Sequence, residues 1–301
     1  MNKAYHEPVL LHECIEGLNL KPGGVYLDLT FGGGGHSREI LKQLKKGWLL
    51  AFDQDEEALK NIWDDKRLQQ VHGNFRYLKN YLRYYKIVQV DGIMADLGVS
   101  SHHFNIPERG FSYKTDAGLD MRMNQEAELS AEVVLNTYTE EHLRKIFREY
   151  GELKNAYRLA KDITSYRKNI PLKVTNDLLQ AISGCIPKKI ENKYLAQVFQ
   201  AIRIEVNQEL EALKLMLTQS AEVVKTGGRL VIITYHSLED RLVKNFIKAG
   251  NFKGEVDTDL YGNVMAPFTP VTRNVIVPTG KEIEKNSRAR SAKLRIAEKN
   301  G

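Results

Sequence analysis

Residues 28–37, DLTFGGGGHS, contain residue types well suited to holding a cofactor. Four consecutive glycines, Gly32 to Gly35, follow a short apolar run, and His36 and Ser37 then open a helical pattern. Glycine permits positive φ and lets a ligand approach the backbone closely. The stretch therefore predicts a ligand-binding loop. The alternative is a turn that only tightens the packing of a strand against a helix.

The spacing of the glycines excludes two common nucleotide sites. The dinucleotide fingerprint G-x-G-x-x-G, started at Gly32 or Gly33, fails because its third position falls on Ser37 or Arg38. A P-loop also fails, because no Lys-Ser or Lys-Thr pair follows the glycines. Asp53 lies about 20 residues past the loop, where an acid can accept hydrogen bonds from both hydroxyls of a ribose. A nucleoside cofactor without a pyrophosphate fits, and S-adenosylmethionine is the common one.

A further carboxylate, Asp96, closes the apolar run DGIMADLG (91–98). It could contact the cofactor or accept a hydrogen bond from the substrate. Alternatively, it caps the segment that follows, as Asp often does. Asp28 and Asp53 end two earlier apolar runs in the same way. Three carboxylates delivered to one edge of a sheet favour the functional interpretation of Asp96.

Alternating strand and helix patterns are expected to position these residues. Apolar, β-rich runs are separated by helical patterns, which is typical of βαβ units in a parallel sheet with right-handed crossovers. Ligands bind such sheets at the carboxyl ends of the strands, where the strand order reverses. The predicted strands are VYLDLTF (25–31), WLLAFDQD (48–55), VHGNF (71–75), DGIMADLG (91–98) and GRLVIITYHS (228–237).

Little strand pattern occurs between about residues 125 and 224, where apolar residues recur at helical spacing. We predict an α/β domain formed by residues 1–104 and 225–301, interrupted by a mainly helical insertion, residues 105–224, that recognises the substrate. A long apolar stripe from Leu195 to Leu217 could pack internally or form the surface of a homodimer. Internal packing is the favoured interpretation.

The charge distribution indicates a polyanionic partner. The net charge is +6, and residues 142–203 contain 13 Lys or Arg against 5 Asp or Glu. Nucleic acid is the favoured partner, and solvated helix faces are the alternative. The segment NSRARSAKLR (286–295) predicts a strip that binds phosphate, because Arg pairs with phosphate through two hydrogen bonds. A surface strand with solvated charges is its alternative.

Other features of the composition narrow the class of protein. No apolar run approaches the ~20 residues that span a bilayer, so we expect a soluble, cytoplasmic protein with no membrane partner. Cys14 and Cys185 are too few for a disulfide framework. His102 and His103 lie near Asp96, but adjacent side chains point apart and no third ligand has a telling spacing. No metal is therefore expected.

Motifs along nearly the whole chain, residues 6 to about 298, resemble one family. They occur in the order HEPVLL, DLTFGGGGHS, DGIMADLGVSS, ERGFSY, LDMRM, IRIEVNQEL, YHSLEDR and NSRARSAKLR. The chain resembles the bacterial 16S ribosomal RNA cytosine-N4 methyltransferases, the MraW or RsmH family. The resemblance implies a class I, Rossmann-like fold with a helical insertion and S-adenosylmethionine as methyl donor. It also implies a cytosine in the decoding region of the small ribosomal subunit as the methyl acceptor.

The resemblance also implies site residues. Carried over by motif, the residues that bind the cofactor are Gly34, Gly35, His36, Asp53, Phe75, Asp96 and His103. The motifs LDMRM and YHSLEDR offer four candidates for the substrate pocket, namely Asp120, Arg122, His236 and Ser237. An ion pair between Asp120 and Arg122 is the plain alternative for the first two.

The chemistry of an exocyclic amine explains why a carboxylate is needed. The N4 lone pair of cytosine is delocalised into the ring, so an acceptor for an N–H proton helps the nitrogen to become pyramidal. We predict that Asp96 is this acceptor. The base must leave its stack to reach the site. Three aromatic residues could then support it or could simply pack in the core: Phe104, Phe111 and Tyr113.

Three rival functions follow from the same residues. The first is a methyltransferase that acts on DNA, protein or a small metabolite, because the cofactor half does not select the acceptor. The second is a nicotinamide oxidoreductase, which the failed fingerprint disfavours. The third is a non-catalytic RNA-binding factor, which the intact Gly34, Gly35, Asp53 and Asp96 disfavour.

Overall fold

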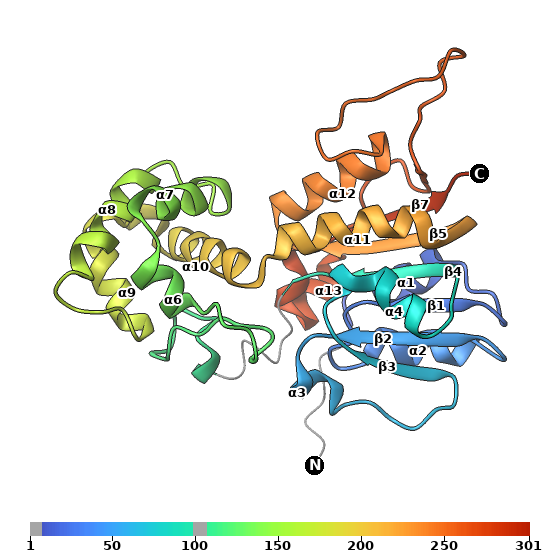
Figure 1. Ribbon diagram of the computed structural model, residues 1–301, viewed down its shortest axis with the longest axis horizontal. Coiled ribbons are helices and arrows are strands. Elements are labelled where there is room, and N and C mark those ends of the chain that lie inside the picture. Colours follow the sequence, from blue (N-terminus) through green and yellow to red (C-terminus); the bar gives the residue numbers. More distant parts are fainter. Residues whose placement is uncertain (1–7, 99–106) are drawn as a thin grey trace. The chain divides into compact units, whose positions relative to one another are not determined.

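The computed structural model describes residues 8–98 and 107–301 of the chain (Figure 1). The chain divides into two compact units. Unit 1 consists of Met1–Gly98 and Leu210–Gly301, and unit 2 of Val99–Glu209. Unit 1 contains the sheet, and the described part of unit 2 is mainly helical.

A seven-stranded sheet forms the centre of unit 1, with the strand order β3-β2-β1-β4-β5-β7-β6. The pairs between β3, β2, β1, β4 and β5 are parallel, and β7 is antiparallel to both β5 and β6. This arrangement confirms the predicted α/β fold class. The strands are β1 (Val25–Asp28), β2 (Trp48–Asp53), β3 (Leu68–His72), β4 (Val90–Asp96), β5 (Val224–Thr234), β6 (Phe268–Pro270) and β7 (Lys293–Lys299).

The strand order reverses between β1 and β4. Strands β2 and β3 extend the sheet on one side of β1, whereas β4 and β5 extend it on the other. Asp28, the last residue of β1, lies in register with Ala51 and Met94. Asp53 and Asp96 therefore lie two residues further toward the carboxyl edge. The sheet brings the three predicted carboxylates to one edge because all three strands run in the same direction.

Helices cover both faces of this sheet. Alternate strand residues point to opposite faces, so the apolar runs of a doubly covered sheet are nearly continuous. Leu27, Phe52 and Ile93 pack in one core, and Tyr26, Leu49 and Met94 in the other. The helices of unit 1 are α1 (Leu11–Leu18), α2 (Gly35–Gln43), α3 (Glu56–Leu59), α4 (Leu78–Tyr84), α12 (Ser237–Ala249) and α13 (Gly280–Lys285). Helix α11 (Glu209–Val223) also packs against the sheet.

Unit 2 has its own hydrophobic core, to which Leu143, Phe147, Leu159 and Phe199 contribute. Its helices are α6 (Ala131–Thr137), α7 (Glu140–Glu149), α8 (Ala156–Tyr166), α9 (Thr175–Ile182) and α10 (Glu191–Asn207). The apolar residues that predicted helices at 3.6-residue spacing are the buried ones. No helix in residues 8–98 or 107–301 is long and apolar enough to cross a membrane.

The long apolar stripe from Leu195 to Leu217 is two helices rather than one. Gln208 adopts left-handed backbone angles, with φ at 49°, and ends α10. The residues of α10 pack in the core of unit 2, whereas Leu213 and Leu217 of α11 pack against the sheet. Unit 2 ends at Glu209, and α11, which lies within the predicted insertion (105–224), packs against the sheet of unit 1.

Candidate active site

The glycine loop joins β1 to α2 at the carboxyl edge of the sheet. Gly32 and Gly34 have φ angles of 52° and 74°, and Gly34 is the N-cap residue that precedes α2. A Cβ atom on Gly34 would lie 2.7 Å from the ring of Trp63 and 2.8 Å from that of Phe31. A Cβ atom on Gly35 would lie 2.2 Å from Pro8. Both the backbone angles and the crowding therefore require bare backbone here.

Asp53 fastens this loop to the end of β2. Its Oδ2 atom accepts a hydrogen bond of 2.9 Å from the amide of Gly32, and its Oδ1 atom accepts one of 2.9 Å from the amide of Asp55. A carboxylate has about four lone-pair sites on its two oxygens. Asp53 therefore holds the loop at the carboxyl edge of the sheet.

His36 and Ser37 lie in the first turn of α2, and their side chains bond to residues outside this helix. The Nε2 atom of His36 lies 3.0 Å from the carbonyl oxygen of Val9, which can only accept, so Nε2 carries the proton. Burial lowers the pKa of His36 to about 4, and the ring is neutral. The Ser37 hydroxyl donates to Asp28 over 2.6 Å. The described contacts of His36 are thus with the protein, and its cofactor contact stays a prediction.

Phe75 follows β3 and begins a short 3₁₀ helix, Phe75–Tyr77. Its ring is half-buried against the core that lies under α4. The neighbouring Asn74 accepts a hydrogen bond from the amide of Arg76 and donates one of 2.6 Å to Gln54. The bond to Gln54 joins the segments that follow β2 and β3. Phe75 therefore lies at the same sheet edge as Asp53.

Asp96 ends β4 and is linked to both neighbouring strands. Its amide donates to the Thr30 hydroxyl over 2.7 Å, and its Oδ1 atom accepts a hydrogen bond of 2.7 Å from the Tyr235 hydroxyl. Burial raises the pKa of Asp96 to about 7, and the negative charges of Asp28 and Glu239 add to this effect. The hydrogen bond from Tyr235 acts in the opposite direction. Asp96 is therefore a carboxylate that changes charge near neutral pH.

Tyr235 is the residue that the sequence analysis missed. It lies between β5 and α12, and its amide donates to Oε2 of Glu239 over 2.9 Å. Its ring leaves little room beside Gly98, where a Cβ atom would be only 3.0 Å away. The motif YHSLEDR contains this tyrosine, but the predicted substrate residues are the two that follow it, His236 and Ser237. Only the pairing of β4 with β5 places its hydroxyl against Asp96.

His236 and Ser237, both predicted to contact substrate, begin α12. The Nδ1 atom of His236 accepts from the amide of Glu239 over 3.4 Å, and its Nε2 atom lies 3.1 Å from Oε1 of the same residue. Glu239 also accepts from the His236 amide over 3.4 Å, which completes a capping box. The ring of His236 thus has a structural role, whereas Ser237 is exposed.

Asp120 and Arg122 belong to unit 2 and form the ion pair that the sequence analysis named as the alternative. Two hydrogen bonds of 2.8 and 3.0 Å join the guanidinium to the carboxylate. Arg122 also donates to the carbonyl oxygen of Ala127 over 2.7 Å. Burial acts to raise the pKa of Asp120, but the hydrogen bonds and charge of Arg122 outweigh it and lower that pKa. Substrate contact by this pair stays a prediction.

The three predicted aromatic residues have different outcomes. Phe111 is buried in the core of unit 2, and Tyr113 packs against that core with its ring centroid 5.8 Å from that of Phe199. Core packing is thus the interpretation that the structure favours for both. Phe104 lies outside the described residues, and so does His103 with its predicted cofactor contact.

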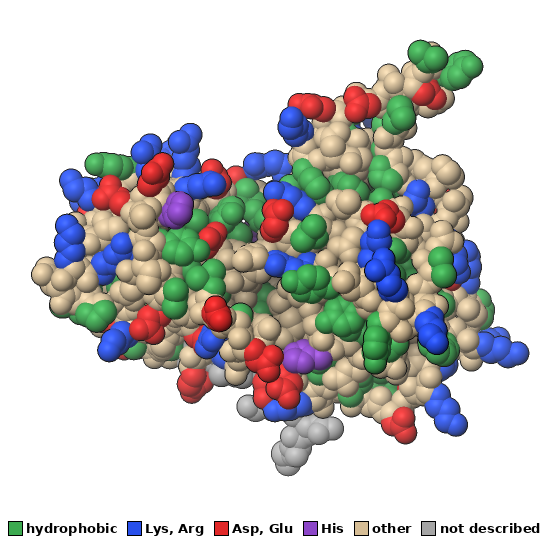
Figure 2. Space-filling model, viewed as in Figure 1, with side chains coloured by type: hydrophobic (Ala, Val, Ile, Leu, Met, Phe, Trp, Pro, Cys, Tyr) green, Lys and Arg blue, Asp and Glu red, His purple; other side chains and the backbone are tan. Residues whose placement is uncertain are grey.

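Unit 2 presents a basic surface on α7 and α8, where Figure 2 shows several Lys and Arg side chains. We call it the α7–α8 face and define it by Arg144, Arg148, Tyr157 and Lys161, which are all exposed. Residues four apart share one side of a helix. The guanidinium of Arg144 lies 5.7 Å from the centroid of the Tyr157 ring, which joins the two helices into one surface. Cations beside an exposed aromatic ring suit nucleic acid.

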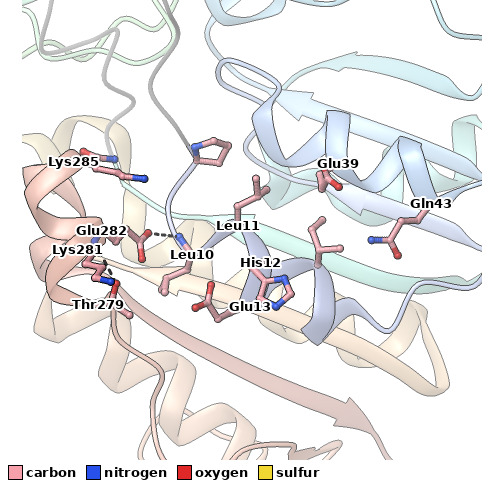
Figure 3. Close-up of a pocket in the computed structure, with 13 residues that line it drawn as sticks. Leu10, Leu11, His12, Glu13, Glu39, Gln43, Thr279, Lys281, Glu282 and Lys285 are labelled. Atoms are coloured by element: carbon pink, nitrogen blue, oxygen red, sulfur yellow. Dashed lines mark hydrogen bonds between the residues drawn. The ribbon is translucent and has the colours of Figure 1, made fainter.

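A pocket of about 430 Å³ lies beside α1, α2 and α13 in unit 1 (Figure 3). The amide of Leu10 donates to Glu282 over 2.7 Å at its rim, and Thr279 accepts from the Glu282 amide. Its lining mixes acids such as Glu13 and Glu39 with bases such as Lys281. No predicted cofactor or substrate residue lines this pocket, so it is separate from the carboxyl-edge site.

Comparison with known proteins identifies the family. A model of the MraW methylase family matches residues 3–300. The chain belongs to this family. Two relatives named ribosomal RNA small subunit methyltransferase H, from Flavobacterium johnsoniae and Bacteroides thetaiotaomicron, are each 56% identical over 296 residues. These alignments cover 98% of this chain and 98% and 97% of the relatives. The chain is also similar to the crystal structure of NSun6 from Pyrococcus horikoshii, with 12% identity and a TM-score of 0.44 over 98% of this chain and 53% of that one.

The cofactor of this MraW methylase is S-adenosylmethionine, as predicted. The carboxyl edge fits such a molecule. The positive φ angles and crowded surroundings of the glycine loop keep its backbone bare, and the adjacent amino end of α2 suits a carboxylate group. Asp53 lies at the end of β2 and is bonded to the amide of Gly32 in this loop. The half-buried ring of Phe75 offers an apolar surface at the end of β3.

Proposed function

We propose that this MraW methylase transfers a methyl group from S-adenosylmethionine to N4 of one cytosine in the decoding region of 16S ribosomal RNA. The observation that carries the proposal is the position of Asp96, a carboxylate at the end of β4 whose amide is bonded to Thr30, two residues before the glycine loop. The names of the relatives and the motifs from HEPVLL to NSRARSAKLR support ribosomal RNA as the substrate. The target is proposed to lie within the small ribosomal subunit, in the cytoplasm.

The proposed cofactor residues have separate tasks. Asp53 accepts hydrogen bonds from the ribose, and Gly34 and Gly35 let the cofactor lie against the backbone. His36 keeps the loop in place through its bond to Val9, and Phe75 contacts the base. His103 completes the proposed set. When bound, S-adenosylmethionine supplies a methyl group on a positively charged sulfur, so neither a metal nor a covalent nucleophile is required.

Asp96 has the task of accepting a proton from the amine. The N4 nitrogen becomes a better nucleophile as one of its N–H bonds is drawn toward a carboxylate. Tyr235 occupies Oδ1 of Asp96, and no residue in 8–98 or 107–301 donates a hydrogen bond to Oδ2. Oδ2 is therefore the atom proposed to receive the N–H. Holding the amine in line with the methyl group can contribute ~7–11 kcal/mol toward the barrier.

Recognition of the RNA is proposed to involve unit 2. The α7–α8 face supplies cations and an exposed Tyr157 ring, which suit phosphates and an unstacked base respectively. Of the 13 Lys and Arg between residues 142 and 203, all but Arg167 and Arg203 are exposed. Four further contacts with substrate remain proposals, namely those of Asp120, Arg122, His236 and Ser237.

The first experiment is methyl transfer from labelled S-adenosylmethionine to small ribosomal subunits that lack the modification. The RNA is then digested, and its nucleosides are identified by mass spectrometry. The expected result is N4-methylcytidine at a single position. A protein that binds the cofactor but methylates neither subunits nor free RNA would overturn the proposed substrate. Transfer to a different atom or base would overturn the proposed specificity alone.

A further inference from the structure

A protruding segment of unit 1 has no task in the proposed reaction. Residues 253–267, which we call the 253–267 arm, extend from the end of α12 to the start of β6 (Figure 1, orange). Both ends of the arm are anchored. The ring of Phe252 stacks on Phe246 at 5.3 Å, and Phe268 is buried 6.4 Å from the same ring. The arm is therefore an ordered protrusion rather than a loose connection.

Hydrogen bonds fix the turn at the tip of the arm. The Asp259 carboxylate accepts from the amides of Tyr261 and Asn263 at 2.8 and 2.9 Å, and from the Asn263 side chain at 3.0 Å. The Gly262 amide donates to the Asp259 carbonyl over 3.0 Å, and Gly262 has a φ of 85°. Asp259 can organise this turn because a short carboxylate bonds readily to nearby backbone amides.

The fixed turn presents apolar side chains to solvent. Leu260 is fully exposed, Tyr261 is 91% exposed and Met265 is 66% exposed. Figure 2 shows hydrophobic side chains at the end of this arm, with acidic side chains next to them. A single exposed apolar residue is ordinary, whereas a contiguous group marks an interaction site. A preorganised turn also lowers the entropic cost of binding.

The charge of the arm selects the class of partner. The 253–267 arm contains three acids, Glu255, Asp257 and Asp259, and a single base, Lys253 at its first position, in a chain whose net charge is +6. Three carboxylates around an apolar tip repel phosphates, unlike the α7–α8 face. The same carboxylates attract a surface that carries Lys or Arg. Charge complementarity therefore favours a basic protein over RNA.

We propose that the 253–267 arm inserts Leu260 and Tyr261 into an apolar pocket, rimmed by Lys or Arg, on a protein of the small ribosomal subunit. This inference rests on the proposed function, because the proposed substrate particle presents protein surfaces beside its RNA. The arm would fix the enzyme on the particle, while the α7–α8 face contacts the RNA. Large side chains in a central apolar pocket commonly carry most of the affinity of an interface.

The test compares two double variants of the full-length protein. Leu260→Ser/Tyr261→Ser removes the apolar tip, and Tyr84→Ser/Val88→Ser removes two similarly exposed apolar side chains elsewhere in unit 1. We expect the arm variant to bind unmodified small subunits about 10-fold more weakly. Its affinity for protein-free 16S RNA and for S-adenosylmethionine should be unchanged. The control variant should match the wild type for all three ligands.

A photocrosslinker at position 261, Tyr261→p-benzoylphenylalanine, identifies what the tip touches. Crosslinks to a subunit protein support the inference, whereas crosslinks to RNA or to a second copy of this chain overturn it. Equal binding of subunits by the arm variant and the wild type also overturns it. If the wild type methylates RNA in subunits, such a result leaves the proposed function standing. A wild type that neither binds nor methylates subunits overturns both together.

Discussion

Two carboxylates, one in each unit, show how differently the units use buried charge. Asp96 in unit 1 faces the acids Asp28 and Glu239, and its pKa rises to about 7 mainly because it is buried. Asp120 in unit 2 is paired with Arg122 through two hydrogen bonds, and its pKa falls although it too is partly buried. Asp96 can therefore gain or lose a proton near neutral pH, whereas Asp120 stays charged.

The contrast between Asp96 and Asp120 reflects two different roles, a reactive group in unit 1 and a stabilising ion pair in unit 2. A carboxylate without a compensating charge costs stability, and such costs are typical of functional sites. A carboxylate held by Arg contributes stability instead. Unit 1 therefore carries an uncompensated carboxylate, Asp96, at its carboxyl edge. In unit 2, the charge of Asp120 is balanced by Arg122.

The largest effect is expected for Asp96→Asn. Loss of the proton acceptor should lower kcat by about 10²- to 10⁴-fold, with little change in the Kd of S-adenosylmethionine. In the wild type, the rate should rise with pH through about 7 as Asp96 loses its proton. In the variant, this rise of the rate with pH should disappear. Single-turnover methylation between pH 5.5 and 9 measures both effects, and full activity in the variant would sink the proposed role.

Stability provides the control for Asp96→Asn. The folded pKa of Asp96 lies above its ordinary value, so the stability that depends on its protonated form is lost as pH rises through 7. Removal of the charge should therefore raise the thermal midpoint at pH 8 and have little effect near pH 4. An equal or lower midpoint at pH 8 would contradict the interpretation of Asp96 as an uncompensated charge.

Next in size is Asp53→Asn, which weakens an acceptor for the ribose and for the Gly32 amide. We expect the Kd of S-adenosylmethionine to rise about 10- to 100-fold, because hydrogen bonds to a charged group contribute about 1.5–3 kcal/mol. Isothermal titration calorimetry measures this change. The matched control is Asp64→Asn, an exposed acid of the same charge beyond α3. Equal losses in the two variants would argue against a specific contact.

In unit 2, Arg148→Glu/Lys161→Glu reverses two charges on the α7–α8 face. Binding of RNA should weaken about 10-fold at physiological salt, and the dependence of affinity on salt should become shallower. The Kd of S-adenosylmethionine should not change. Lys45→Glu/Lys46→Glu in unit 1 is the control, because both lysines are exposed and the net charge changes equally. If both variants lose the same affinity, only total charge matters.

Asp120→Asn should lower the stability of unit 2 by about 1–2 kcal/mol at pH 7, since it weakens a charged pair of hydrogen bonds. The folded pKa of Asp120 is depressed, so this contribution is present above the ordinary pKa and is lost as pH falls through the folded value. Chemical denaturation at pH 7 and pH 3 measures the difference. Unchanged stability together with weaker RNA binding would instead favour the predicted substrate contact.

The smallest effect is expected for Tyr235→Phe, which removes one hydrogen bond to Asp96. That bond lowers the pKa of Asp96, so its loss should move the acidic limb of the rate profile to higher pH by about half to one unit. The maximal rate should fall only about threefold. Tyr85→Phe, which loses a bond to a backbone carbonyl instead, is the control. If the rate of the variant rises at the same pH as that of the wild type, the hydrogen bond from Tyr235 does not tune Asp96.

Local sequence patterns predicted most strands of the sheet and the edge at which the site residues meet. Apolar runs and helical spacing predicted β1, β2, β4, α7 and α8, because these periodicities are local properties of the chain. The glycines before α2 predicted the loop, and the acids that end β1, β2 and β4 predicted a shared carboxyl edge. This worked because parallel strands that follow one another through helices must place their carboxyl ends together.

The contacts between distant side chains became known only from the fold. Tyr235 and Asp96 are 139 residues apart, and they touch because β5 pairs with β4 in a given register. The break at Gln208 is equally invisible in a continuous apolar stripe, since both halves are buried but against different cores. The exposed tip of the 253–267 arm has an ordinary composition, and only the fold leaves it uncovered. Contacts of this kind depend on long-range packing, which local side-chain patterns do not encode.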